Sequence, residues 1–421
     1  MAGIAVLLII LGCGAYQYLK GTIAKGVATI IVAVCASIVA LSYFEWLAGF
    51  FLSKGSDSRF PALIPWAQTL CFVLLFIVTF ALLQTVVMQL MRVPVDFGFL
   101  PERIGRVVCG ILLGLVVSGL LLTAAGMSPL PNKYPYQRFD DRNPDPEKPN
   151  KVLLNVDGLV TGWFGMVSNG SFRALRNPRS FTVLHPDFLD QLYLNRHKSG
   201  DTTPFVTSPG SIEVPRKAGY WFAPDDLKDS DGQPIPTKTA SRLMIVRVGI
   251  KKRALNDAGN FCLSQLRMIC KQKGLSDNSL AGKAKNVYPI GYVSSPKTIQ
   301  RRQLTDVVTI VNDDFDRGET QRWIDFVFHV PNDSTPALVQ FKMNDIAELS
   351  SLASADQIPE LVPFVQRSGD ANPSQKPNES GSQPSRPNRA NRDRPSSSGG
   401  TGLSPPSQML VGPALDEDLQ Q

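Results

Sequence analysis

Residues 107–132 read VVCGILLGLVVSGLLLTAAGMSPLPN and contain no Asp, Glu, Lys or Arg. A helix needs about 20 predominantly apolar residues to cross about 30 Å of hydrocarbon, and this stretch exceeds that length. Three earlier charge-free stretches reach a similar length: residues 1–19, 26–44 and 60–91. The sequence therefore predicts an α-helical membrane domain with four transmembrane helices over residues 1–131.

The distribution of charge separates this membrane domain from the remainder of the chain. Residues 1–132 contain seven Lys or Arg and four Asp or Glu, whereas the whole chain contains 43 and 36. The remainder thus has the charge density of an ordinary soluble domain. The net charge of +7 is spread over both parts without a basic stripe, which argues against a nucleic acid as partner.

The first stretch has an alternative interpretation as a cleaved signal sequence, because residues 10–13 (ILGC) resemble a lipoprotein cleavage box. No Lys or Arg precedes the apolar run, although signal sequences begin with a positive region. Three further spans follow at once. We therefore expect the first stretch to remain as a transmembrane helix.

The short loops predict the orientation of the spans. The loops after the first and third spans contain Lys20, Lys25, Arg92, Arg103 and Arg106. The loop after the second span holds two basic residues, at positions 54 and 59, and a long domain such as the one after the fourth span carries little weight in the positive-inside rule. We expect both termini, and with them the C-terminal domain, to be extracytoplasmic.

Small residues recur every fourth position in the last span, at Gly110, Gly114 and Ser118. Such a face allows two helix backbones to approach closely in lipid. It predicts either packing within the four-helix unit or self-association into a homo-oligomer. A substrate pathway would require a buried ionisable residue. Glu45 comes nearest, but it stands beside Trp46 at the end of a span, which is typical of an interfacial carboxylate.

Two local motifs accompany the four spans. A tight hinge, KGTIAKG, occupies residues 20–26, and an acidic-basic step, Glu102-Arg103, leads into the span that contains Gly110 and Gly114. With this plan, residues 1–130 resemble the colicin V production protein (CvpA) family. The family pattern has a third glycine where this chain has Arg106.

The resemblance implies a multi-pass protein of the bacterial cell (inner) membrane, linked to toxin production or export or to envelope maintenance, without a defined reaction. Some relatives resemble a fusion of these helices to an extracytoplasmic trypsin-like protease. That architecture also favours an extracytoplasmic C-terminal domain.

The soluble part divides by composition. Residues 132–150 are rich in Pro and charge and predict a linker, residues 151–199 short helices, residues 200–366 a β-rich domain, and residues 367–421 a disordered tail. Within residues 151–199, glycines interrupt the apolar stretch 152–167 too often for it to be a fifth span. We expect a membrane-surface or domain-capping helix there, and another helix over residues 185–196.

Apolar residues alternate in three runs of the β-rich domain, at residues 244–250, 324–330 and 337–343. A period of two predicts half-buried strands, and weaker strands are expected at residues 287–293 and 307–311. We predict a soluble β-rich, sandwich-like domain, with residues 323–343 as a hairpin and residues 345–355 as a helix.

The sequence predicts no catalytic, cofactor-binding or metal-ligating residues. The three histidines, His185, His197 and His329, do not stand in the motifs of a serine protease or at zinc-site spacing. Acidic turns such as residues 312–318 lack the residues of a calcium loop. Cys262 and Cys270 are predicted to be unpaired thiols, unless a hairpin between them brings them together.

The expected function is that of a non-enzymatic membrane protein with a membrane-anchored interaction domain. Its expected partners are the lipid bilayer, a second copy of the chain, and an unknown envelope protein or wall polymer. The alternative is a transport component assembled through the fourth span, and hydrolysis by the C-terminal domain is a third option.

Overall fold

We describe the computed structural model of the chain at residues 2–53, 61–91, 98–129, 136–140, 143–150, 152, 154–169, 181–196, 203–236, 238–272 and 284–366. Every described residue belongs to one compact unit, which lies within Met1–Asp370. The predicted disordered tail, His197 and part of the predicted linker lie outside the described residues.

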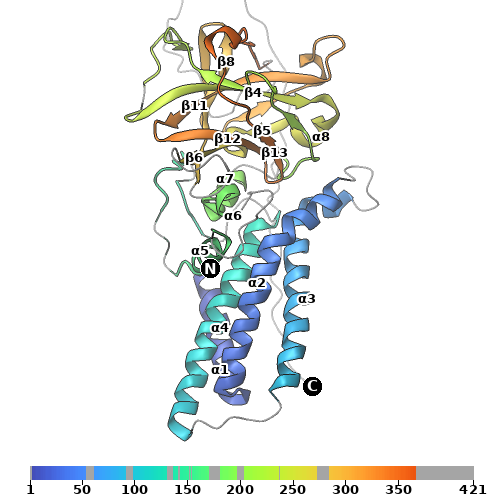
Figure 1. Cartoon of the computed structure of the whole chain (residues 1–421), viewed down its shortest axis with the longest axis vertical. Helices are drawn as coiled ribbons and strands as arrows, with labels where there is room; N and C mark the ends of the chain where they lie inside the picture. Colours follow the sequence, from blue (N-terminus) through green and yellow to red (C-terminus); the bar gives the residue numbers. More distant parts are fainter. Residues whose placement is uncertain are drawn as a thin grey trace, which may run out of the picture. The chain divides into compact units, whose positions relative to one another are not determined.

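Four long helices form the N-terminal part: α1 (Ala2–Lys20), α2 (Ile23–Leu52), α3 (Ala67–Leu90) and α4 (Phe99–Met127), with a 3₁₀ turn, η2 (Pro61–Trp66), before α3. All four are long and apolar enough to cross a membrane, which confirms the predicted transmembrane helices. They run side by side, with α1 against α4, and α2 against both α3 and α4 (Figure 1).

The side chains of these helices are distributed by size as expected in a lipid environment. Ala33, Ala36 and Ala40 of α2 are completely buried, so small residues allow the neighbouring helices to pack closely around α2. Large apolar side chains point outward instead, as Leu74 and Ile104 show with more than half of their surface exposed. An apolar exterior of this extent belongs in hydrocarbon.

Three short helices follow: α5 (Val156–Asn169), α6 (Phe181–Leu184) and α7 (Phe188–Arg196). The helix expected over residues 185–196 begins three residues later, after the turn through Pro186. Arg196 at the end of α7 donates to the carbonyl oxygens of Ala125 and Gly126, at 3.0 and 3.2 Å. A guanidinium thus caps the negative C-terminal end of α4.

The described residues of the β-rich part form three sheets. Their strands are β1 (Ile212–Glu213), β2 (Tyr220–Phe222), β3 (Lys228–Asp229), β4 (Ser241–Lys251), β5 (Asn260–Cys262), β6 (Leu266–Gln272), β7 (Ala284–Val287), β8 (Pro289–Ser295), β9 (Thr298–Arg301), β10 (Val307–Thr309), β11 (Gln321–Pro331), β12 (Ser334–Phe341) and β13 (Asp345–Glu348), with one short helix, α8 (Leu255–Ala258). The largest sheet has the order β1-β4-β11-β8-β9-β3, with β2 also on β4. The second has the order β13-β12-β6-β7, and β10 pairs with β5.

The two larger sheets share one hydrophobic core. Met244 and Phe326 of the largest sheet and Met268 and Phe341 of the second are buried together in it. Alternate residues of each strand enter this core, as the period of two predicts. The architecture is the sandwich-like one expected, and Figure 1 shows the strands β4, β11 and β12 that form its centre.

The predicted hairpin over residues 323–343 is wrong, although both of its strands exist. β11 pairs with β4 on one edge and with β8 on the other, whereas β12 pairs with β6 and β13. Both edges of β11 are therefore occupied, and the turn after Pro331 carries the chain from one sheet to the other. Alternation of apolar residues is the same in a hairpin and in a crossing between sheets, so the sequence could not distinguish them.

The helix predicted over residues 345–355 is also wrong, because Asp345–Glu348 forms β13, antiparallel to β12. The turn before it places Lys342 at φ 53°, which reverses the chain direction. The Asp345 carboxylate accepts from the backbone N–H groups of Gly210 and Ile212 at 2.9 and 2.8 Å, and its burial raises its pKa. These long-range contacts hold the segment extended.

No disulfide joins Cys262 of β5 to Cys270 of β6. Both thiols are completely buried, and the sulfur of Cys262 donates to the Thr305 carbonyl oxygen at 3.6 Å. Burial raises the pKa of Cys270 to about 12, so this thiol stays protonated and unreactive.

Candidate functional site

The small-residue face of α4 lies against α1. A Cβ atom on Gly110 would stand 2.6 Å from the Cα of Gly14, and one on Gly114 would stand 2.7 Å from the Cα of Ile10. Ser118, next on this face, is completely buried and donates its hydroxyl back to the Leu115 carbonyl at 3.1 Å. The three residues thus serve packing inside the four-helix unit in this structure, and α1 covers the face that self-association would need.

The two motifs behind the family resemblance meet in space at the start of α2. Glu102 accepts from the backbone N–H of Ile23 and from Nε of Arg106, both at 3.1 Å. A carboxylate is thereby placed at the positive N-terminal end of α2. Gly26 faces Gln17, whose Nε2 would lie 2.4 Å from an added Cβ. Gln17 donates from Nε2 to the Thr22 carbonyl oxygen at 3.1 Å, which stabilises the turn between α1 and α2 and is a structural role.

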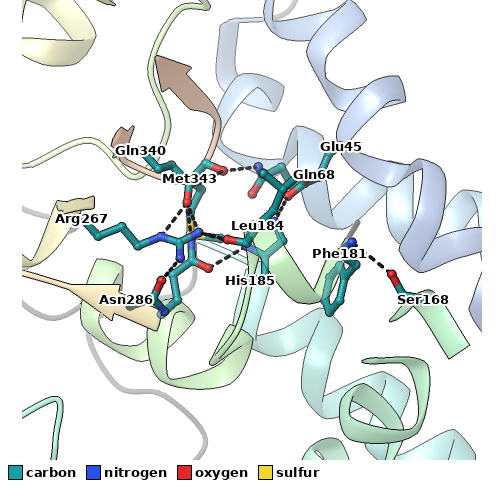
Figure 2. A network of polar contacts seen from close by, with 11 residues as sticks. Glu45, Gln68, Ser168, Phe181, Leu184, His185, Arg267, Asn286, Gln340 and Met343 are labelled. Carbon is teal, nitrogen blue, oxygen red and sulfur yellow. Dashed lines mark hydrogen bonds and ion pairs between the residues drawn. The ribbon is translucent and has the colours of Figure 1, made fainter. Parts of the chain in front are cut away.

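A buried polar network links α2 and α3 to the sheets, and Figure 2 shows it from close by. We call it the polar junction; it consists of Glu45, Gln68, His185, Gln191, Arg267, Asn286 and Gln340. Sequence reasoning identified only Glu45 and His185 of these. A usable signal existed for Arg267, which is the only charge in the apolar run LRMIC of residues 266–270.

Arg267 is the centre of the polar junction and is only 2% exposed. Its Nε donates to Oε1 of Gln340 at 2.7 Å, and its two Nη atoms donate to Oδ1 of Asn286 and to the Leu184 carbonyl oxygen. Burial lowers the pKa of Arg267 to about 10, which still leaves the guanidinium charged at neutral pH. One side chain thus binds β6, β7, β12 and α6 together.

His185, directly after α6, continues the network to the membrane helices. Its Nδ1 lies 2.7 Å from Oε1 of Gln191, and its Nε2 lies 2.7 Å from Oε1 of Glu45 in α2. Its side chain has no exposed surface. Since both ring nitrogens are engaged by protein groups, His185 is positioned as a structural link and not as a general base.

A second link joins α3 to the turn after β12. The Met343 carbonyl oxygen accepts from Nε2 of Gln68 at 3.4 Å and from Nε2 of Gln340 at 3.0 Å. Gln191 of α7 also donates to Oε1 of Gln340 at 2.8 Å. Helices that cross the membrane and strands of the β-rich part therefore share one hydrogen-bonded network.

Two cavities adjoin the polar junction. One of about 1090 Å³ is lined by Asp187, Asp190, Lys238, Lys285 and His329, among others. The other, of about 500 Å³, lies between α5 and the α6–α7 turn and shares Asp187 and Asp190 with the first. Enclosure by protein and the charge of Asp190 raise the pKa of Asp187. Acids and bases are mixed in the larger cavity, so its charge selects no single class of ligand.

Within the described part of the chain, no three His, Cys, Asp or Glu residues are grouped closely enough to hold a metal ion.

His329 makes the stability of the β-rich part sensitive to acid. Partial burial, together with the charges of Lys238 and Arg301, lowers its pKa below the ordinary 6.5, while Glu147 acts in the opposite direction. As the pH falls through 6.5, the unfolded chain takes up the proton before the folded one does, so stability is lost. We expect His329→Gln to reduce the fall in unfolding temperature between about pH 7 and about pH 5. Equal falls in both proteins would contradict this.

Comparison with protein-family models, with curated proteins and with solved structures finds no match for this chain.

Proposed function

We propose that the chain is a multi-pass protein of the bacterial cell membrane whose β-rich part is a non-enzymatic interaction domain on the extracytoplasmic side. In this proposal it serves envelope maintenance or toxin production and export, as the resemblance of residues 1–130 to the CvpA family implies. Its partner is an envelope protein or a wall polymer. The hinge of residues 20–26 and the Glu102-Arg103 pair contact each other through the hydrogen bond from Ile23 to Glu102. This contact supports the resemblance, because two motifs that contact each other form one structural unit.

The polar junction is the observation that carries this proposal. A domain that the membrane helices merely tether would need only a linker, whereas here Glu45 and Gln68 of the helices are hydrogen-bonded into the network around Arg267. Buried polar networks of this kind specify one arrangement, since each unpaired member is costly. A force on the β-rich part, or a structural change caused by a partner bound there, would therefore be transmitted to α2 and α3.

The orientation can be tested with single thiols on the full chain. Ser230 and Gln89 are exposed, uncharged residues, the first in the β-rich part and the second at the far end of α3. We expect Ser230→Cys to react with a membrane-impermeant maleimide in intact cells, and Gln89→Cys to react only after permeabilisation. The unsubstituted chain measures the background from the native thiols. The reverse pattern would place the β-rich part in the cytoplasm and would overturn the proposed role outside it.

The biological role can be tested in a host strain that lacks the chain. Envelope maintenance predicts greater sensitivity to detergents and to large antibiotics, whereas a role in toxin export predicts loss of secreted toxin with an unchanged envelope. The full chain should restore either property. The alternative, a transport component assembled through α4, would require a surface other than the face that α1 covers.

A further inference from the structure

The uncovered face of α5 is apolar, while its polar groups point into the protein. Leu159 and Met166 are 56% and 69% exposed, and Gly162 between them is exposed as well. Asp157, on the opposite side of the helix, is completely buried. A surface helix of a water-soluble protein exposes its polar side chains instead. We call the outward apolar side chains, Leu159, half-buried Trp163 and Met166, the α5 apolar face; Gly162 and Met166 also border the smaller cavity beside the α6–α7 turn.

Hydrogen bonds on the buried side of α5 fix the orientation of this helix. The Asp157 carboxylate accepts from the Tyr136 hydroxyl and from the backbone N–H of Gly158, and the Thr161 hydroxyl donates to the Asp157 carbonyl oxygen at 2.8 Å. Arg138 in turn donates to the Tyr136 oxygen at 3.1 Å. Burial raises the pKa of Tyr136 far above its ordinary value, so its hydroxyl remains a donor. Turning the apolar face inward would break this set of bonds.

The position of α5 along α4 shows what lies beside its apolar face. A Cβ atom on Gly119 would stand 2.4 Å from the Val156 carbonyl oxygen and 2.7 Å from a methyl group of Val160. Gly119 precedes the end of α4 at Met127 by about 12 Å of helix axis. Leu121, at the same level, is 52% exposed on the outside of the membrane helices. The contact of α5 with α4 therefore lies at a level where the membrane helices still expose large apolar side chains.

We propose that α5 is an interfacial helix, which lies in the edge of the bilayer with its apolar face against lipid acyl chains. With 14 residues it is about 21 Å long, too short to span the membrane but suited to lie in its surface. The proposal rests on the four membrane helices and is independent of the biological role proposed above. It gives the chain a second kind of membrane contact, on the side that carries the β-rich part.

Spin labels on the full chain in phospholipid vesicles test this proposal. A nitroxide is attached to Leu159→Cys or to Met166→Cys, and its collision rates are measured with oxygen, which concentrates in lipid, and with a water-soluble nickel chelate. Leu121→Cys is the lipid-facing control and Ser230→Cys the water-facing one. The unsubstituted chain, treated with the same label, gives the background from native thiols.

We expect both α5 positions to show the high ratio of oxygen to nickel collisions found at Leu121→Cys, and Ser230→Cys to show the inverse ratio. Free access of the nickel chelate at Leu159→Cys and Met166→Cys would place the α5 apolar face in water and overturn the proposal. Protection from both reagents would overturn it as well, because protein, from a partner or a second copy, would then cover the face.

Discussion

Replacement of Arg267 by methionine is expected to lower the free energy of unfolding by about 3–5 kcal/mol, because it leaves buried acceptors without a donor. Methionine fills most of the space, so the loss reports the hydrogen bonds to Gln340, Asn286 and the Leu184 carbonyl rather than a large cavity. Such a loss is a large fraction of the stability of an ordinary domain. The measurement is chemical or thermal unfolding of the detergent-solubilised chain.

Arg301→Met is the matched control for this experiment. Arg301 lies on β9 with about half of its side chain exposed, and its ion pair with Asp229 is 4.0 Å long. Exposed pairs of this kind contribute about 1 kcal/mol or less. Arg267→Lys should resemble Arg267→Met, because an ammonium group cannot serve three acceptors arranged around a planar guanidinium. Equal stability of Arg267→Met and Arg301→Met would show that the polar junction does not hold the parts together.

A leucine at Gly114 is expected to separate α1 from α4. Even the first carbon of its side chain would stand 2.7 Å from the Cα of Ile10, and a backbone atom cannot move aside as a side chain can. Overpacking typically costs about 1–3 kcal/mol, and contact with backbone places this variant at or above the upper end. The fraction of folded, monodisperse protein after heating in detergent should fall accordingly.

Gly12→Leu supplies the control, because nothing lies within 4 Å of a Cβ atom at that position of α1. Leucine also favours a helix more than glycine does by about 0.5–1 kcal/mol, so this variant should be as stable as the natural chain or more so. The two substitutions also separate packing from self-association. If Gly114→Leu keeps the unfolding temperature and only converts an oligomer into a folded monomer, the α4 face serves assembly and not packing against α1.

The membrane helices were predictable because length and apolar character alone define them. Each charge-free stretch corresponds to one of α1 to α4, since the bilayer imposes a minimum length that no soluble strand or turn approaches. The strands at residues 244–250 and 324–330 were equally clear, because one face of each is buried over several alternating positions.

The errors arose where long-range contacts decide local structure. Nothing near Asp345 in the sequence shows that its carboxylate accepts from Gly210 and Ile212, more than 130 residues earlier, and that this holds the segment extended. The polar junction was missed for the same reason. Gln340 lies buried in a strand, where a polar side chain is costly, and its Oε1 is satisfied by Arg267 and Gln191, which are distant in the sequence.

The polar junction also imposes an order on biosynthesis. Glu45 bonds to a residue 140 positions later, and Gln68 to one 275 positions later. The membrane helices are synthesised first. Glu45 and Gln68 therefore lack these partners until the β-rich part has been made and has folded. Contacts between such distant residues form slowly. A chain that stops before residue 343 would leave Gln68, at the start of α3, without this partner, so an unpaired polar group in the membrane half would distinguish the incomplete chain from the complete one.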